Sequence, residues 1–224
     1  MNQFNSAWNF YFNNWQYFAV LAAPVFAVEI ATAYLLLPLE NISPENIAEY
    51  FGDNIFSIGI LSAVGTVLSV GFLGSLYLSF NAKSSSSELE PTTALLSGIY
   101  KFFPLFGAYV LCIIAVFFGL LLLILPGIYL GARLALFPAF IMLEGKGVID
   151  SLKLSWEETD EHGGTLFGLT IFFILLTTII SGIFSSLLDQ GIIQLLILGI
   201  VEYVIIIPWV YVYYSLYQLS LIHI

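Results

Sequence analysis

Three ionisable side chains lie deep inside apolar stretches of this chain, and their chemistry needs an explanation first. Glu29, Arg133 and Glu202 each stand well inside a run of apolar residues. An unpaired charge near the centre of a bilayer costs at least about 2.5–3.5 kcal/mol on insertion scales, so partners or a water-filled cavity are expected. The sequence therefore predicts an intramembrane cluster of one arginine and two glutamates.

This candidate cluster has a structural and a functional interpretation. In the structural one, Arg133 pairs with Glu29 or Glu202 and locks the first, fourth and sixth apolar segments together. In the functional one, a proton or anion relay runs around Arg133. Intramembrane charge favours function by default, but so small a set makes the structural pair the preferred interpretation.

Elsewhere the residue pattern offers no reaction chemistry. His162 follows a run of acidic residues, but their spacing matches no zinc or carboxylate–histidine motif. The chain has no Ser-His-Asp order, no His-Glu-x-x-His and no P-loop, so we expect neither an enzyme nor a bound metal or cofactor. The formal net charge of −10 argues against a nucleic-acid partner, which demands a basic surface.

The elements that position these residues follow from the composition. Of the 224 residues 60% are hydrophobic and 9% charged, whereas a soluble domain carries about 25% charged residues. Apolar segments of about 20 residues can cross a bilayer, and they must be helical because lipid offers no backbone hydrogen bonds. We predict one all-α domain, residues 1–218, with six spans at about 16–37, 55–80, 102–125, 128–143, 166–188 and 192–217.

The basic residues predict the orientation of the chain. Lys83 and Lys101 flank the second connection, and Lys146 and Lys153 lie in the fourth, whereas the first connection carries only carboxylates. The positive-inside rule then places both termini and the lysine-bearing connections in the cytoplasm. The second connection, residues 81–98, is rich in serine and interrupted by proline, and is predicted to be a flexible cytoplasmic loop.

Two further segments show helical periodicity. Before and into the first span, aromatic residues recur on one face and predict an interfacial helix, with an extended first span bearing an aromatic belt as the alternative. In the second span, small residues predict the central packing helix, with a Ser/Thr-lined pathway as the alternative. The aromatic set is Phe4, Trp8, Tyr11, Phe12, Trp15 and Phe18, and the small set is Gly59, Ser62, Gly65, Thr66, Ser69, Gly71, Ser75 and Ser79.

The most specific local pattern lies between residues 125 and 164. A tight hairpin at Pro126-Gly127 leads into a short fourth span, followed by a glycine-flanked turn and an amphipathic helix. We predict that this helix forms a cytoplasmic elbow at the membrane surface. The structural motif comprises Pro126, Gly127, Pro138, Gly145, Ser151, Ser155 and Trp156.

This order of residues resembles the YciC-type family of uncharacterised bacterial inner-membrane proteins. The resemblance is sharp over residues 125–166, and the aromatic Asn-Phe opening of the chain supports it. A related pattern occurs in membrane domains fused to some glycerophosphodiester phosphodiesterases. The resemblance implies a six-span protein of the bacterial inner membrane and brings no catalytic residue.

The last six residues, 219–224, form a separate case. They read Leu-Ser-Leu-Ile-His-Ile, which is the literal translation of a transposon end used in sequencing libraries. We hypothesise that they are a sequencing-adapter artefact and that the natural C-terminus differs.

For function, the sequence favours a non-enzymatic integral membrane protein that organises lipid or partner proteins, including copies of itself. The alternative is a small transporter with its pathway around Glu29, Arg133 and Glu202. A water-filled cavity reaching Arg133 would favour the transporter, and a dry, packed arrangement would favour the structural protein.

Overall fold

The computed structural model describes residues 2–222, and the predicted all-α class is confirmed over that part of the chain. The α-helices are α1 (Asn2–Asn13), α2 (Trp15–Leu36), α3 (Ile47–Ser84), α4 (Pro91–Tyr100), α5 (Phe102–Leu122), α6 (Ile124–Leu134), α7 (Phe137–Leu143), α8 (Val148–Glu158), α9 (Gly163–Leu187) and α10 (Ile192–Ile222). Two short 3-10 helices, Leu37–Glu40 and Pro44–Asn46, connect α2 to α3.

Within the described residues, six helical stretches are long and apolar enough to cross a membrane, as the sequence predicts. They are Trp15–Glu40, Pro44–Ser84, Phe102–Leu122, Ile124–Leu143, Gly163–Leu187 and Ile192–Ser220. The protein is therefore a multi-pass membrane protein. The fourth stretch is not one continuous helix, because α6 ends at Leu134 and α7 begins at Phe137.

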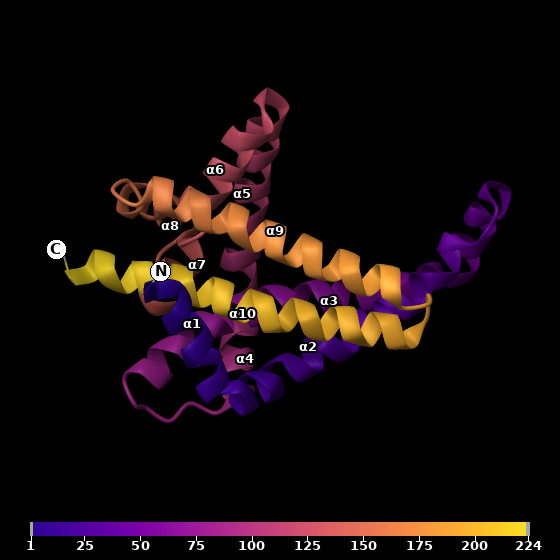
Figure 1. Ribbon diagram of the computed structural model, residues 1–224, viewed down its shortest axis with the longest axis horizontal. Coiled ribbons are helices and arrows are strands. Elements are labelled where there is room, and N and C mark those ends of the chain that lie inside the picture. The colour runs from indigo at the N-terminus through magenta and orange to yellow at the C-terminus, as the bar shows by residue number, and fades with distance from the viewer. Residues whose placement is uncertain (1, 223–224) are drawn as a thin grey trace.

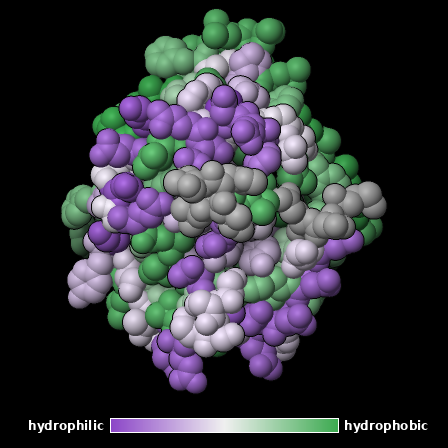
Figure 2. All heavy atoms as spheres, turned by 90° about the vertical axis from the view of Figure 1, so that its left-hand side faces the viewer, coloured by the Kyte–Doolittle hydropathy of each residue, from purple (hydrophilic) through white to green (hydrophobic). Residues whose placement is uncertain are grey.

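Four long helices form the body of the molecule. In Figure 1, α2, α3, α9 and α10 run along the long axis, and the hairpin of α5 and α6 leaves this body at a steep angle. Helix α1, the last turns of α10, α8 and the connection 85–90 lie toward one end of the long helices. Figure 2 faces this end and shows hydrophilic residues gathered there around apolar ones.

Helix α3 is the central packing helix over its second half. Gly71, Gly74, Ser75 and Ser79 are buried against neighbouring helices. A side chain at Gly59, in the first half, would meet open space. The predicted packing role is thus confirmed from about Gly71 onward, where α2, α4, α5, α7 and α10 pack on α3.

Helix α1 is separate from the first span, as predicted. The chain breaks at Asn14, whose amide Nδ2 donates to the Phe10 carbonyl at 2.9 Å. The aromatic residues of α1 divide between two environments. Phe10 stacks on Tyr211 of α10 with ring centroids 4.2 Å apart, whereas Phe12 remains 58% exposed. Helix α1 therefore packs on the bundle with one face and leaves the other open.

The prediction of a flexible loop over residues 81–98 is wrong at both ends, because α3 continues to Ser84 and α4 begins at Pro91. Proline suits the first turn of a helix, because its missing N–H has no helical partner there. Gly98 then allows α4 to cross α3 closely, since a Cβ atom at Gly98 would lie 1.9 Å from the Gly71 carbonyl oxygen. The serine-rich segment before Pro91 does connect the helices without regular structure.

The crossing of α3 and α4 gives a direct test of packing. Gly98→Ala places a methyl group on the Gly71 backbone and should cost about 1–3 kcal/mol of stability, as overpacked sites do. Gly168→Ala is the matched control, because a Cβ atom there meets nothing within 4 Å. Thermal unfolding in detergent should show a lower Tm for Gly98→Ala alone, and equal Tm values would contradict the close crossing.

Candidate functional site

Arg133 lies in the last turn of α6 and is buried, with 3% of its side chain exposed. Its Nη2 atom donates to Asp160 Oδ1 at 2.9 Å, and its Nε atom donates to Thr159 Oγ1 at 2.8 Å. Tyr129 accepts a further bond from Nη1 at 2.8 Å, and the guanidinium lies over the Trp156 ring at 4.1 Å. The arginine is therefore satisfied by the segment at and just after α8.

The backbone around Arg133 is tied to the same helix. Ser155 Oγ donates to the Arg133 carbonyl at 2.8 Å and accepts from the Leu136 N–H at 3.1 Å. Thr159 Oγ1 also approaches the Arg133 carbonyl, at 3.1 Å. These contacts satisfy backbone groups that the end of α6 would otherwise leave unpaired. Ser155, one of the predicted motif residues, thus fixes the break between α6 and α7, and Trp156, another, lies under the Arg133 guanidinium.

The predicted cluster of Glu29, Arg133 and Glu202 does not form. The sequence interpretation placed Arg133 at mid-depth by counting from the ends of a continuous span over residues 128–143. The break after Leu134 puts Arg133 beside α8 instead, where Asp160 offers a nearer carboxylate. A bond to a charged group close by outweighs a remote charge, so the arginine pairs locally.

Glu29 instead joins three long helices. From α3, the Ser69 hydroxyl donates to Glu29 Oε1 at 2.7 Å. From α10, the Tyr203 hydroxyl donates to Glu29 Oε2 at 2.5 Å. Glu202, next to Tyr203 on α10, is exposed and does not share these bonds. The two glutamates predicted to face one arginine therefore have different environments, one hydrogen-bonded between helices and one open.

The remaining motif residues shape the chain on either side of Arg133. The predicted hairpin turn at Pro126-Gly127 is wrong by a few residues, because the turn falls at Leu123 and Pro126 lies in the first turn of α6. Gly127 is needed for packing, since a Cβ atom there would lie 2.5 Å from the Leu120 side chain of α5.

The other end of this segment also follows from its residues. Pro138 lies in the first turn of α7, and Gly145 adopts φ +68 in the turn to α8, a conformation that favours glycine. Ser151 of α8 is fully buried and donates to the Val148 carbonyl at 2.9 Å. Helix α8 therefore sits firmly on the bundle, as the predicted elbow requires.

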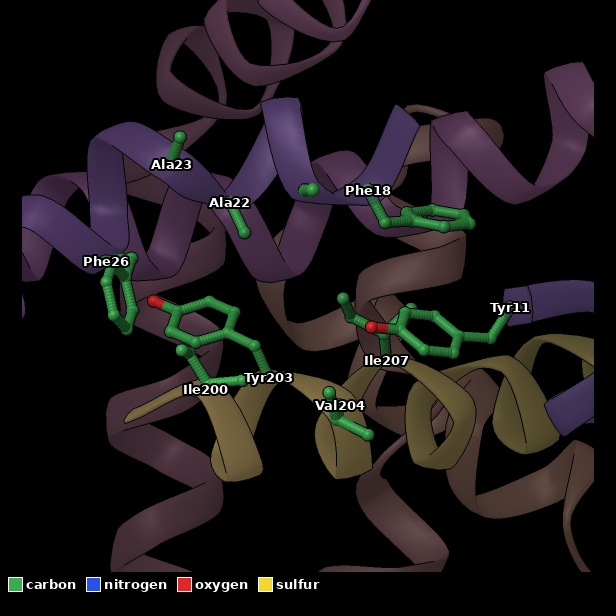
Figure 3. A pocket seen from close by; sticks show the side chains of 10 residues that line it. Tyr11, Phe18, Ala22, Ala23, Phe26, Ile200, Tyr203, Val204 and Ile207 are labelled. Atoms are coloured by element: carbon green, nitrogen blue, oxygen red, sulfur yellow. The ribbon is translucent and has the colours of Figure 1, made fainter. Parts of the chain in front are cut away.

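An apolar groove of about 230 Å³ lies between α2 and α10, next to the Glu29 contact. Figure 3 shows side chains of α2 on one wall and of α10 on the other. Its lining residues are Tyr11, Phe18, Ala19, Ala22, Ala23, Phe26, Ile200, Tyr203, Val204 and Ile207. The three alanines leave space where larger side chains would close the two helices on each other.

The groove has a closed end and an end bordered by α1. At the closed end α2 and α10 touch, because a Cβ atom at Gly199 would lie 2.7 Å from the Phe26 ring. Tyr203 lines the groove there and holds Glu29 with its hydroxyl. At the other end stands Tyr11 of α1, and burial raises the pKa of its hydroxyl, which stays neutral at physiological pH. The groove is therefore uncharged along its walls.

Sequence reasoning did not find this groove. Ala19, Ala22 and Ala23 stand in a long apolar run and carry no chemical signal of their own. Their role depends on which part of α10 faces them, and that pairing follows from tertiary structure. Among the described residues no group of three or more His, Cys, Asp or Glu side chains could hold a metal ion.

Comparison with known proteins places the chain in a family. A family model described as a domain of unknown function (DUF7847) matches residues 46–191. This range is more than half of the chain, so the chain belongs to that family. The match contains α8 and its contacts with Arg133, whereas α1, α2 and α10 lie outside it.

A curated relative agrees with this placement. A UPF0259 membrane protein of Photorhabdus laumondii is 35% identical over 96 residues, which make up 43% of this chain. The aligned part covers only 36% of the relative's own length. No solved structure matches the chain. The predicted kinship with an uncharacterised family of bacterial membrane proteins is confirmed, and the YciC-type designation stays a prediction.

The position of Arg133 predicts how its removal behaves. Arg133→Leu removes hydrogen bonds to a charged group, each of which contributes about 1.5–3 kcal/mol, and should clearly lower the Tm in detergent. Adding Glu29→Gln or Glu202→Gln should recover none of this loss, because neither carboxylate is its partner. Asp160→Asn alone should have little effect, since Asp160 is 78% exposed and its ion pair is screened by water. If either glutamate variant recovers the lost Tm, that glutamate is the partner of Arg133 and the intramembrane cluster forms after all.

Proposed function

We propose that the protein is a non-enzymatic lipid-binding protein of the bacterial inner membrane, and that the groove between α2 and α10 holds an acyl chain of a membrane phospholipid. The groove itself is the observation that carries this proposal. It is apolar along its length, and Ala19, Ala23 and Ile200 on its rim are exposed, so it opens toward the lipid.

The size of the groove suits a chain better than a compact ligand. Small-molecule pockets usually measure about 300–1,000 Å³ and combine apolar walls with a few convergent polar groups. This groove measures about 230 Å³, and the one polar group at its closed end, the Tyr203 hydroxyl, is already bonded to Glu29. A flexible hydrocarbon chain needs no polar partner and can follow the groove between the helices.

The direction of the groove supports a phospholipid. It runs from the contact at Phe26 toward α1, whose polar residues include Asn5 and Asn9. A lipid lying in the leaflet beside α1 would place its head group near these polar residues and one chain in the groove. We further propose that this leaflet is the cytoplasmic one, with both termini in the cytoplasm, because the four lysines fall in connections on the same side.

The transporter alternative loses its geometric basis. It required Arg133 to face Glu29 and Glu202 within the membrane, and Arg133 instead bonds to residues at the end of α8. Glu29 is engaged by Ser69 and Tyr203 from neighbouring helices. The hydrogen bonds of Glu29 support a structural role for this residue, and the apolar groove beside it supports lipid binding.

Filling the groove tests the proposal. The double variant Ala19→Leu/Ala23→Leu puts branched side chains where the chain would lie. In membranes containing a phospholipid with a photoreactive diazirine in its acyl chain, we expect the wild-type protein to cross-link within α2 and α10. The double variant should lose most of this signal, because larger side chains take up the space.

Ala27→Leu is the matched control, because Ala27 is an exposed alanine of the same helix that does not line the groove. It should cross-link like the wild type. Both proteins should elute as single species in detergent, so that a lost signal reports the groove and not misfolding. Equal cross-linking at α2 and α10 in the wild type and the double variant would overturn acyl-chain binding.

A further inference from the structure

We propose that the hairpin of α5 and α6 enters the bilayer from the face that carries α8 and turns back inside the hydrocarbon of that leaflet, so that its apolar tip contacts acyl chains and never reaches the opposite surface. This inference is independent of the groove between α2 and α10. It concerns the depth at which two of the six apolar stretches turn.

The base of the hairpin is held at one surface of the membrane. Arg133, at the end of α6, bonds to Asp160, which is 78% exposed. It also lies against the first residue of α9, since a Cβ atom at Gly163 would come within 3.0 Å of the Arg133 side chain. Helix α9 is a 25-residue apolar helix, so its first residue marks one end of a membrane crossing. Arg133 stands at that end.

The return leg is too short to cross the bilayer from there. Helix α6 has 11 residues from Ile124 to Leu134. At about 1.5 Å per residue it is about 16 Å long, roughly half of a hydrocarbon core of about 30 Å. The α9 helix beside it, with 25 residues, is about 37 Å long. Measured from Arg133, the tip at Leu123 therefore falls short of the far surface even if the hairpin points straight inward. The other leg, α5, has 21 residues, but its first part packs within the body against α3, α7 and α8.

The chemistry of the tip agrees with a turn in lipid. The five residues Leu121–Leu125 are all apolar and are 59–78% exposed. The turn between α9 and α10, by contrast, carries Asp189 and Gln190. If the tip stood in water, these exposed side chains would be unfavourable, because removing apolar area from water contributes roughly 25 cal/mol per Å².

The turn itself is tight and is closed by two backbone hydrogen bonds. The Leu123 N–H donates to the Gly119 carbonyl at 3.1 Å, and the Gly127 N–H donates to the Leu123 carbonyl at 3.4 Å. Glycines 119 and 127 let the two legs approach closely, since a Cβ atom at Gly119 would lie 2.7 Å from the Gly127 Cα atom. A tight turn of this kind exposes fewer backbone groups to hydrocarbon than a longer loop would.

The hairpin also points away from the direction of the long helices. In Figure 1 its legs leave the body formed by α2, α3, α9 and α10 at a steep angle, and the tip stands clear of them. If the long helices cross the bilayer, a hairpin at a steep angle to them lies roughly parallel to the membrane plane, in the leaflet next to α8. A crossing pair and a shallow hairpin both return the chain to the same side, so the lysine distribution is compatible with either.

Site-specific labelling tests the depth of the tip. Cys112 is the only cysteine, so Cys112→Ala gives a background in which Leu123→Cys can carry a single label. Leu123 is 69% exposed, and the protein therefore does not shield it. We expect a membrane-impermeant maleimide to leave it unmodified in both right-side-out and inverted vesicles and to modify it fully after denaturation in detergent.

A spin label at the same position provides a positive signal. Its relaxation in proteoliposomes should be enhanced several-fold more by oxygen, which concentrates in hydrocarbon, than by a water-soluble nickel complex. Glu88→Cys and Gln190→Cys are controls, because both positions are exposed. Glu88 follows the end of α3 and Gln190 follows the end of α9, and these two connections lie at opposite ends of the long helices. They should react with the maleimide from opposite sides and respond to nickel.

Maleimide modification of Leu123→Cys from the side that modifies Gln190→Cys would overturn the proposal, because the hairpin would then cross the bilayer. Modification from the other side, or a stronger response to nickel than to oxygen, would also overturn it by placing the tip in water. Elution of each variant as a single species, together with the two control patterns, confirms that the protein tested is folded and inserted. Loss of lipid cross-linking in the groove would leave these outcomes unchanged.

Discussion

The buried guanidinium of Arg133 is the interaction on which the arrangement of this protein most depends. Its side chain is 3% exposed, and its N–H groups donate hydrogen bonds to Thr159, Tyr129 and Asp160. A buried arginine is tolerated only where its donors are satisfied, so the residues around it are fixed by that requirement. The same contacts end α6, hold α8 against the bundle and set the starting point of α9. The positive charge at the end of α6 also complements the negative end of the helix dipole.

Within the membrane the long helices are joined by other means. Lipid provides no hydrophobic drive for helices to associate, so close backbone approach and hydrogen bonds supply it. Gly71 and Gly98 bring α3 and α4 into contact, and Glu29 links α2 to α3 and α10 through Ser69 and Tyr203. Where such contacts stop, α2 and α10 separate and leave the groove. The lipid-binding proposal thus rests on a place where packing between helices is incomplete.

Much of the fold could be predicted from the sequence, because apolar run length directly reports the bilayer as solvent. The six apolar stretches and the amphipathic helix α8 are found this way. Pro138 marks the break after Leu134, because it has no N–H to bond the Leu134 carbonyl, but the sequence does not show which carboxylate the break brings next to Arg133. Helix α4 was missed because the serine-rich composition before Pro91 masked the short helix that follows. The hypothesis that residues 219–224 derive from an adapter stays a prediction, and residues 223–224 lie outside the described part of the chain.

The most direct test of this account is a pair of distances measured by pulsed electron resonance between spin labels in proteoliposomes. One pair joins Leu123 to Glu158 and the other joins Leu123 to Gln190, in the Cys112→Ala background. If Arg133 anchors the short α6 leg beside α8, Leu123 lies within about 16 Å of that anchor, and α9 separates the anchor from Gln190 by about 37 Å. We expect the distance to Glu158 to be shorter by about 10 Å or more, given these helix lengths and the steep angle of the hairpin. A shorter distance to Gln190 would place the tip at the opposite surface and contradict the anchoring of α6 by Arg133.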